Sequence, residues 1–567
     1  MITSAGVGTR WWITGIGAGI ALCAWLVNPT LAGAGLAVAL VGAVLWWRYH
    51  RSRSAGLVTR WSRRSRRNDG VASVWAILRV GSSWAVRRKT RVLRPSLAGV
   101  PRWRRWRTPI RELATPLARV GMLRVWSPIE DVTVGLGGPR CGKTGELCCR
   151  ILDAPGAVIA TSTRTDLIEH TAHGRGRWGR PVGVFNPSGV GGVPSTITFS
   201  PLAGCADPTV ATARATDLLS ATAHPASGDA EHWLSLARMS LAPLLHAAAL
   251  GDGTMWDVRA WIADPERAEV VVLRLLARSR TRVFDSDAEQ FFTTGDRTRA
   301  SICATIMPCL AWLTDPHADA AARAGGFDVA ALLRARGTVY LLGAEDAQVA
   351  PLVTALTGHI AREARRIAGT QPKGRLDPPL TLALDEAALI CPIPLDRWTA
   401  DMGGRNITIH IRVQSRAQLR QRWGDVGAAA ILNNAATVLI FGGTRDSDDL
   451  AAYSVLTGDR YEQVDQHSQR VPVLSAAQIA QLPAGHAVLI RRGLAPVIGR
   501  PLMVWRRRRV LRHMDVVAEK WATVRARRRQ RQLPPTRKPI AALPAVDRPD
   551  DQPIRVVPSA DSTTDAA

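Results

Sequence analysis

The sequence predicts an α/β protein with a largely parallel sheet that helices cover on both faces. Apolar, β-branched runs that end in glycine or polar residues, as buried strands do, occur at 131–136, 156–167, 181–189, 337–346, 379–388, 406–415, 436–443 and 486–493. Between the third and fourth runs, residues 201–325 are rich in Ala and Leu at helical spacing. We therefore expect an all-helical insertion that divides the sheet domain into two parts.

A glycine-rich loop follows the first of these strands and carries the pattern G-x-x-x-x-G-K-T. Its residues are Gly137, Gly138, Pro139, Arg140, Cys141, Gly142, Lys143 and Thr144. Backbone N–H groups of such a loop, together with the N-terminus of the following helix, cradle phosphate groups. Lys143 is expected to reach the β- and γ-phosphates of ATP, and the Thr144 hydroxyl to bind Mg²⁺.

A second motif, LTLALDEAA, ends a strongly apolar run with Asp385 and Glu386. Ligands of open α/β sheets bind at the carboxyl ends of the strands, where these two side chains are expected. We assign Asp385 to the Mg²⁺ shell and Glu386 to the activation of the attacking water. The alternative is an ordinary acidic pair on the surface at the end of a strand.

Two further residues are candidates for catalysis. Gln414 ends the strand that follows Asp385, where a polar side chain can sense the γ-phosphate; a loop amide without such a role is the alternative. Arg405 precedes the same strand, and an arginine at a subunit edge can reach the γ-phosphate of a neighbouring subunit. A solvated loop arginine is an equally simple interpretation of Arg405.

The net charge of +28 lies mostly in two flanking stretches. Residues 48–107 hold 18 basic residues and one acidic residue, and residues 506–532 hold 11 basic and two acidic residues. The first stretch also contains several tryptophans. Anionic lipid and nucleic acid both fit such a surface, and the sequence does not separate them.

Two apolar runs near the N-terminus, about 11–27 and 31–47, predict transmembrane helices of minimal length. Tryptophans lie at their ends, and basic residues flank both outer ends, which predicts a multi-pass protein of the cytoplasmic membrane with both termini in the cytoplasm. A cleaved signal peptide is the alternative for the first run. The eight cysteines form no C-x-x-C pair, which favours a reduced, cytoplasmic soluble part.

The motifs together, in this order, resemble the TraG/TraD-type coupling proteins of type IV secretion and conjugation. The matching segments are GGPRCGKT, TSTRTDL, VFNPSG, W-x₄-R-x₂-L-x₂-LLHAAA at 233–249, LALDEAA, RVQSRAQLRQRWG at 412–424, LIFGG, and the closing segment 474–496. The resemblance covers roughly residues 11–505. Arg140 and Cys141 depart from it, because small residues are more usual at those loop positions.

The resemblance implies a membrane-anchored, RecA-like ATPase that works as a homo-hexamer. Such proteins recruit relaxase-bound single-stranded DNA or effector proteins and pass them to an inner-membrane secretion channel. The predicted segments are a membrane anchor at 1–50, a basic juxtamembrane segment at 51–125, the RecA-like domain at 126–200 and 326–505, the helical insertion at 201–325, and a basic, then Pro/Asp-rich disordered tail at 506–567.

Two alternative functions remain at this stage. An FtsK/SpoIIIE-like pump for double-stranded DNA would carry a C-terminal winged-helix reader, for which residues 506–567 are too irregular. A membrane receptor that docks secretion substrates without hydrolysing ATP would not need Lys143, Thr144, Asp385 and Glu386 together.

Overall fold

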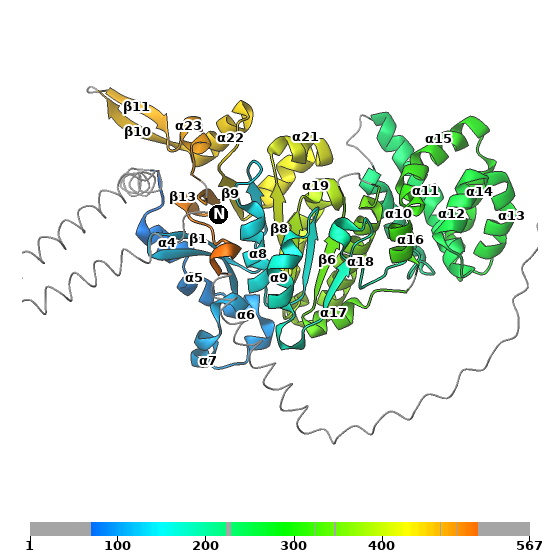
Figure 1. Cartoon of the computed structure of the whole chain (residues 1–567), viewed down its shortest axis with the longest axis horizontal. Coiled ribbons are helices and arrows are strands. Elements are labelled where there is room, and N and C mark those ends of the chain that lie inside the picture. The colour runs from blue at the N-terminus through cyan, green and yellow to red at the C-terminus, as the bar shows by residue number, and fades with distance from the viewer. Residues whose placement is uncertain are drawn as a thin grey trace, which may run out of the picture. The chain divides into compact units, whose positions relative to one another are not determined.

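One large sheet organises the part of the chain that the computed structural model describes, which comprises residues 70–222, 228–323, 325–344, 348–464, 467–483 and 485–507 (Figure 1). Within these residues the sheet has nine strands, in the order β13-β12-β9-β3-β8-β7-β4-β6-β5. The strands are β3 Thr133–Leu136, β4 Val158–Ser162, β5 Val182–Phe185, β6 Thr338–Leu342, β7 Leu380–Asp385, β8 Ile407–Val413, β9 Thr437–Phe441, β12 Ala487–Arg491 and β13 Leu494–Gly499. The predicted membrane segments at 11–27 and 31–47 and the tail from residue 508 lie outside the described residues.

The sheet is mixed. The seven neighbouring strands β9-β3-β8-β7-β4-β6-β5 pair in parallel, whereas β12 pairs antiparallel with both β9 and β13. Successive side chains alternate between two apolar clusters: in β6, Val339 and Leu341 enter one cluster, and Tyr340 and Leu342 enter the other. Burial on both faces explains why the strands are nearly continuous apolar runs in the sequence. The predicted α/β class is confirmed, with an antiparallel edge added.

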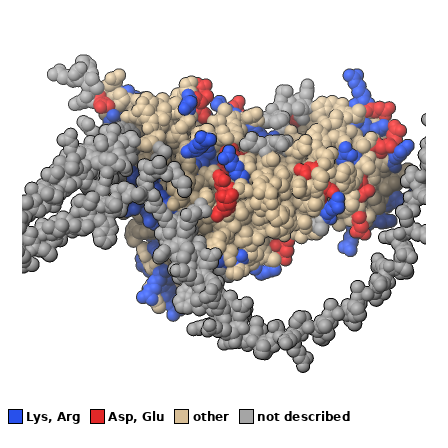
Figure 2. Space-filling view, viewed as in Figure 1, with Lys and Arg blue, Asp and Glu red and all other residues tan. Residues whose placement is uncertain are grey.

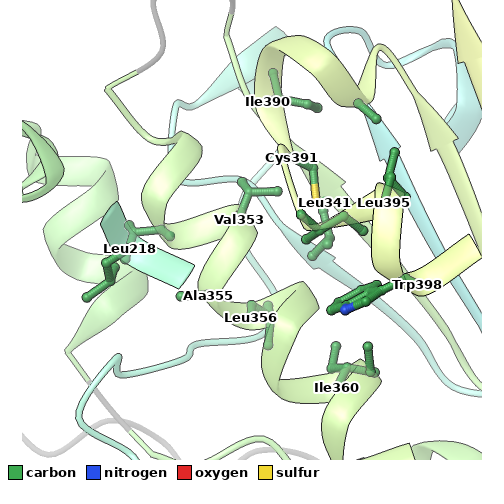
Figure 3. Close-up of a cluster of buried hydrophobic side chains, with 14 of the residues drawn as sticks. Leu218, Leu341, Val353, Ala355, Leu356, Ile360, Ile390, Cys391, Leu395 and Trp398 are labelled. Atoms are coloured by element: carbon green, nitrogen blue, oxygen red, sulfur yellow. The ribbon is translucent and has the colours of Figure 1, made fainter. Parts of the chain in front are cut away.

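Helices cover both faces of the sheet. Helices α8 Lys143–Asp153 and α9 Asp166–Arg175 contribute to the cluster with Tyr340, and the other face is covered by α18 Ala350–Thr370, α20 Leu395–Asp401 and α21 Arg416–Asn434. The short helices α17 Val329–Ala335 and α19 Ala387–Ile390 complete this set. Figure 3 shows the apolar cluster in which α18 places Val353, Leu356 and Ile360 close to Leu341 and Trp398. This packing joins the sheet to the helical region beyond α18.

Within the described part of residues 201–325, only helices and connecting turns occur. They are α10 Pro208–Thr222, α11 Gly228–Leu250, α12 Met255–Ala263, α13 Pro265–Leu276, α14 Val283–Thr293, α15 Asp296–Ile306 and α16 Pro316–Ala322. One stretch of α11, Glu231–Leu250, is long and apolar enough to cross a membrane, but 56% of it is buried in the structure. Because Leu241, Leu244 and Leu245 of this stretch pack in the protein core, we interpret α11 as the central helix of the insertion.

An N-terminal layer packs on the antiparallel end of the sheet. It consists of α4 Val74–Val80, α5 Ser83–Arg87, α6 Thr90–Leu93, α7 Arg102–Arg107, β1 Ala114–Val120 and β2 Leu123–Pro128. The β1–β2 hairpin shares an apolar cluster with β9, β12 and β13, and Arg119 pairs with Arg500 through two backbone hydrogen bonds of 2.8 and 2.9 Å. The predicted boundary at residue 126 therefore falls inside β2.

The remaining elements lie beyond β9 in the chain. Helices α22 Ser447–Thr457 and α23 Ala476–Ala480 flank a separate hairpin of β10 Asp459–Val464 and β11 His467–Pro472, which projects from the body (Figure 1). Short 3-10 helices occupy Pro95–Leu97, Ile110–Glu112, Arg177–Gly179, Val190–Gly192, Met307–Thr314, Pro372–Gly374 and Met402–Arg405.

Candidate nucleotide site

The predicted phosphate loop joins β3 to α8 at the carboxyl edge of the sheet. Gly142 has a φ of 100° and Arg140 a φ of 59°, so the backbone turns sharply just before the helix. A Cβ atom at Gly138 would lie 2.6 Å from the carbonyl oxygen of Gly443, which shows that only a glycine lets the loop approach the turn after β9. Lys143 is 6% exposed, and its Nζ donates to the carbonyl oxygens of Gly137 and Gly138 at 2.5 and 2.8 Å. The loop thus holds its lysine folded back over the turn.

Asp385 and Thr144 meet across the same edge. The Thr144 hydroxyl donates to Asp385 Oδ2 at 2.9 Å, although the two residues are 241 positions apart. Asp385 is 4% exposed, and its Oδ1 has no hydrogen-bond partner. Burial raises the pKa of Asp385 to about 6, and the charge of Glu386 adds to this shift. A buried carboxylate oxygen without a partner beside a hydroxyl fits Mg²⁺, which takes few protein ligands and completes its shell with phosphates and water.

No group of three or more His, Cys, Asp or Glu residues in the described ranges is arranged to hold a metal ion. Thr144 and Asp385 are the residues that would hold the ion.

Glu386 follows the buried strand β7 in a left-handed conformation, with a φ of 50°. This backbone region is uncommon for a residue with a side chain and is frequent at functional sites. Gln414 Nε2 donates to Glu386 Oε1 at 3.4 Å, and Gln418 Nε2 donates to Glu386 Oε2 at 3.5 Å. The structure therefore brings Glu386 and Gln414 together, as a shared role in catalysis requires.

Gln418 was not recognised in the sequence. It lies in the first turn of α21, where its backbone N–H donates to Ser415 Oγ at 3.1 Å and its Oε1 accepts from the N–H of Gln414 at 2.9 Å. The S-x-x-Q spacing at a helix start is the signal that predicts this arrangement.

Strand order explains how these groups meet. Strand β8, which ends just before Gln414, lies between β3 and β7. It pairs in parallel with both, so that Leu136 is opposite Val413 and Asp385 is opposite Arg412. Gln414 therefore leaves the sheet between the phosphate loop and the Asp385–Glu386 pair.

A buried charge cluster, comprising Glu146, Arg150 and Arg412, lies beneath the loop and was also missed. Glu146 Oε1 accepts from Arg150 Nε at 2.6 Å, and Glu146 Oε2 accepts from Arg412 Nε at 3.1 Å. All three side chains are at most 2% exposed. A charged residue inside the apolar run of β8 was the available signal, since such a charge needs a buried partner.

Arg405 lies elsewhere. It precedes β8, at the opposite edge of the sheet from Lys143, and its Nε lies 3.2 Å from Asp401 Oδ2. Asp401 also pairs with Arg365 at 2.8 Å. Within one chain Arg405 is thus apart from the phosphate loop, and its proposed role toward a neighbouring subunit stays a prediction.

Cys141, in the phosphate loop, is half-buried. Burial raises the pKa of its thiol, although Lys143 opposes the shift. A raised pKa leaves little thiolate at neutral pH, so this environment does not favour reactivity.

Comparisons with known proteins identify relatives of this arrangement. Residues 379–484, which include β7, β8 and Glu386, match the family model described as "TraM recognition site of TraD and TraG". No curated protein matches the sequence.

Solved structures resemble most of the described fold. The unbound bacterial conjugative coupling protein TrwBdeltaN70 is 18% identical with a TM-score of 0.52, over 69% of this chain and 89% of that one. The plasmid coupling protein TrwB in complex with ADP and Mg²⁺ gives the same values. TrwB with the GTP analogue GDPNP is 17% identical, also with a TM-score of 0.52, over 68% of this chain and 89% of that one. This chain thus shares the fold of those coupling proteins, and its residues 379–484 are similar to a segment of TraD and TraG.

Proposed function

We propose that this chain is a membrane-anchored ATPase that uses ATP hydrolysis to recruit and move substrates, DNA above all, into a conjugation-type secretion channel. The observation that carries the proposal is the meeting of Thr144 with Asp385 beside Glu386 and Gln414. These are the groups that a hydrolysing phosphate-loop enzyme needs, and a docking receptor without hydrolysis has no use for them.

Each residue has a distinct part in this proposal. The loop amides and Lys143 bind the phosphates and orient them, with Lys143 leaving its two carbonyl partners to do so. Thr144 and Asp385 would hold Mg²⁺, which would supply positive charge to the phosphate oxygens. Glu386 accepts a proton from the attacking water, and Gln414 holds the Glu386 carboxylate in position.

Support for the substrate class comes from the relatives. TrwB, which has the same fold, is described as a conjugative coupling protein, and one of its structures holds ADP and Mg²⁺. The matched region at 379–484 takes its description from recognition of TraM by TraD and TraG, which supports a protein partner for this part of the chain. A homo-hexamer in which Arg405 reaches the neighbouring site belongs to the same proposal.

The N-terminal layer supports a location at the membrane. Trp75, Trp84 and Trp103 are 80%, 48% and 56% exposed, which is unusual for tryptophan in a folded domain. The guanidinium of Arg88 lies 4.2 Å from the Trp84 ring centre, and that of Arg104 lies 5.1 Å from Trp103. Figure 2 shows basic atoms gathered at the lower left, where Figure 1 places α5 and α7. Aromatic rings beside cations suit an anionic lipid surface.

A carbonate wash of membranes tests the anchor, because an anchored full-length chain should remain in the membrane fraction. Release of the chain into the wash would contradict the anchor.

The decisive experiment measures phosphate release by the full-length protein in detergent, with and without single-stranded DNA, beside Lys143→Ala. We expect DNA to stimulate the wild type and Lys143→Ala to lose at least about a hundredfold of the rate. Lys373→Ala, which removes an exposed lysine far from the loop, is the matched control and should retain the rate.

Equal, slow hydrolysis by the wild type and by Lys143→Ala with DNA present would refute the motor. Single-stranded DNA affinity should fall steeply with salt, since cations released from phosphates drive such binding. Affinity that does not change with salt would argue against a contact led by phosphates.

A further inference from the structure

Trp505 is an exposed aromatic side chain that lies directly on the phosphate-loop helix. A Cβ atom added at Gly145 would lie 2.1 Å from Trp505 Cζ3, and one added at Gly142 would lie 3.6 Å from Trp505 Cη2. The indole therefore covers the first turn of α8. Nevertheless, Trp505 is 51% exposed, so half of this large apolar surface faces solvent.

The backbone around Trp505 is held firmly on both sides. Met503 and Val504 are 2% and 1% exposed and belong to the clusters that flank the β13 end of the sheet and α8. On the other side, Arg507 donates to both oxygens of Asp153, at 2.7 and 2.9 Å, and to the carbonyl oxygen of Cys149 at 3.3 Å. Met503, Val504 and Arg507 thus fix the position of the Trp505 indole, and within the described residues about half of that indole is exposed.

The position of Trp505 relative to the phosphates gives it a role. Lys143 reaches the β- and γ-phosphates, and the amides that follow it cradle the α-phosphate. The nucleoside is bonded to the α-phosphate, so it must leave the loop beside Thr144 and Gly145. Gly145 is the residue that Trp505 covers, which places an indole where the base emerges.

We infer that Trp505 is the stacking platform for the base of the bound nucleotide. This inference rests on the proposed nucleotide site and adds the residue that holds the nucleoside half of the ligand. Stacking uses the π-face that every base has, so Trp505 favours nucleotides over inorganic polyphosphate without distinguishing adenine from guanine. Glycine at 145 is required because any side chain there would displace the ring.

Competition binding to the full-length protein tests the inference with three ligands: ATP, GTP and inorganic tripolyphosphate. Trp505→Ala should raise the dissociation constants of ATP and GTP roughly tenfold to a hundredfold, as loss of one base-stacking contact does, and leave that of tripolyphosphate within about twofold. Trp505→Phe, which keeps an aromatic face, should restore most of the affinity for both nucleotides. Trp256→Ala is the control, because Trp256 is 44% exposed on α12, in the helical insertion.

The outcomes separate this inference from the proposed function. Unchanged ATP affinity in Trp505→Ala would overturn the stacking role while leaving the site intact. An equal loss for ATP and tripolyphosphate would also overturn it, since Trp505 would then only support the loop. If the wild type binds none of the three ligands, the proposed nucleotide site fails, and the inference fails with it.

Discussion

Asp385 and Glu146 are two buried carboxylates at the first turn of α8, one bonded to it and one within it, but their bonding is opposite. Asp385 has one oxygen bonded to Thr144 and one oxygen with no partner. Glu146 has both oxygens engaged by arginines, Arg150 on one side and Arg412 on the other. Both residues are buried, with exposed fractions of 4% for Asp385 and 1% for Glu146. The difference shows that an incomplete set of hydrogen bonds, rather than burial, marks the carboxylate that is open to a ligand.

The largest effect is expected at Glu386, which follows Asp385, the carboxylate with an oxygen that lacks a hydrogen-bond partner. Glu386→Gln keeps the shape of the side chain but removes its ability to accept a proton, so ATP hydrolysis should fall at least about a hundredfold. ATP binding and the thermal unfolding midpoint should remain near those of the wild type, because Glu386 is part-exposed at the end of a strand. Phosphate release, nucleotide binding and a melting curve test this together. A variant that hydrolyses ATP at the wild-type rate would remove Glu386 from the reaction.

Substitution of Glu146, whose two oxygens are both bonded to arginines, should lower the unfolding free energy of the protein. Glu146→Ala leaves Arg150 and Arg412 as buried cations without their shared partner, which is expected to cost about 3–5 kcal/mol of unfolding free energy. Urea unfolding of the full-length protein measures this loss. Glu146→Gln, which retains hydrogen-bonding oxygen, is the milder comparison. A Glu146→Ala protein with wild-type stability and no ATPase activity would instead assign Glu146 to catalysis.

A smaller effect is expected at the groups that hold Glu386. Gln414→Ala should slow turnover by about tenfold, because it removes a weak hydrogen bond of about 1 kcal/mol and the link to the nucleotide. The dissociation constant for ATP should change less than the rate. Single-turnover hydrolysis measures the rate, and Gln418→Ala gives a paired value from the neighbouring amide. If Gln414→Ala weakens binding and leaves single-turnover chemistry intact, Gln414 is a binding residue.

The smallest effect concerns pH and the buried charge cluster. His410 is buried beside it, donating to or accepting from Thr133 Oγ1 at 2.9 Å. Burial, then the charges of Arg150 and Arg412, lower its pKa well below the usual 6.5. The unfolded chain therefore takes up a proton near pH 6.5 that the folded chain refuses, so stability falls as pH drops below that value. From pH 7 to 5.5 we expect a loss of about 1 kcal/mol from this group.

Urea unfolding at the two pH values measures the change, and His410→Gln serves as the reference. The variant should lose less stability than the wild type over this interval, whatever its absolute stability. Asp385, whose pKa is raised to about 6, shifts stability in the opposite direction and is common to both proteins. Identical pH dependence in the two proteins would contradict a neutral, buried His410.

The motifs that could be predicted from the sequence are those whose residues lie close together in the chain. The phosphate loop and the Asp385–Glu386 pair each occupy a few consecutive positions after an apolar strand, and the structure brings Thr144 to Asp385 as expected. The parallel character of the sheet followed from strands that are apolar throughout. The antiparallel addition of β12 and β13 did not, because β12 is a short apolar run like the parallel strands and only its partners in the sheet reveal its direction.

The sequence by itself therefore determined the α/β class, the loop, the Asp385–Glu386 pair at the end of its strand and the helical segment between them, since local patterns encode those features. Tertiary structure alone decided that β8 lies between β3 and β7, that Glu146 meets Arg412 from 266 positions away, and that Trp505 covers Gly145. These contacts join segments that are remote in the chain. Strand order and packing create them, and no local periodicity specifies which remote segments become neighbours.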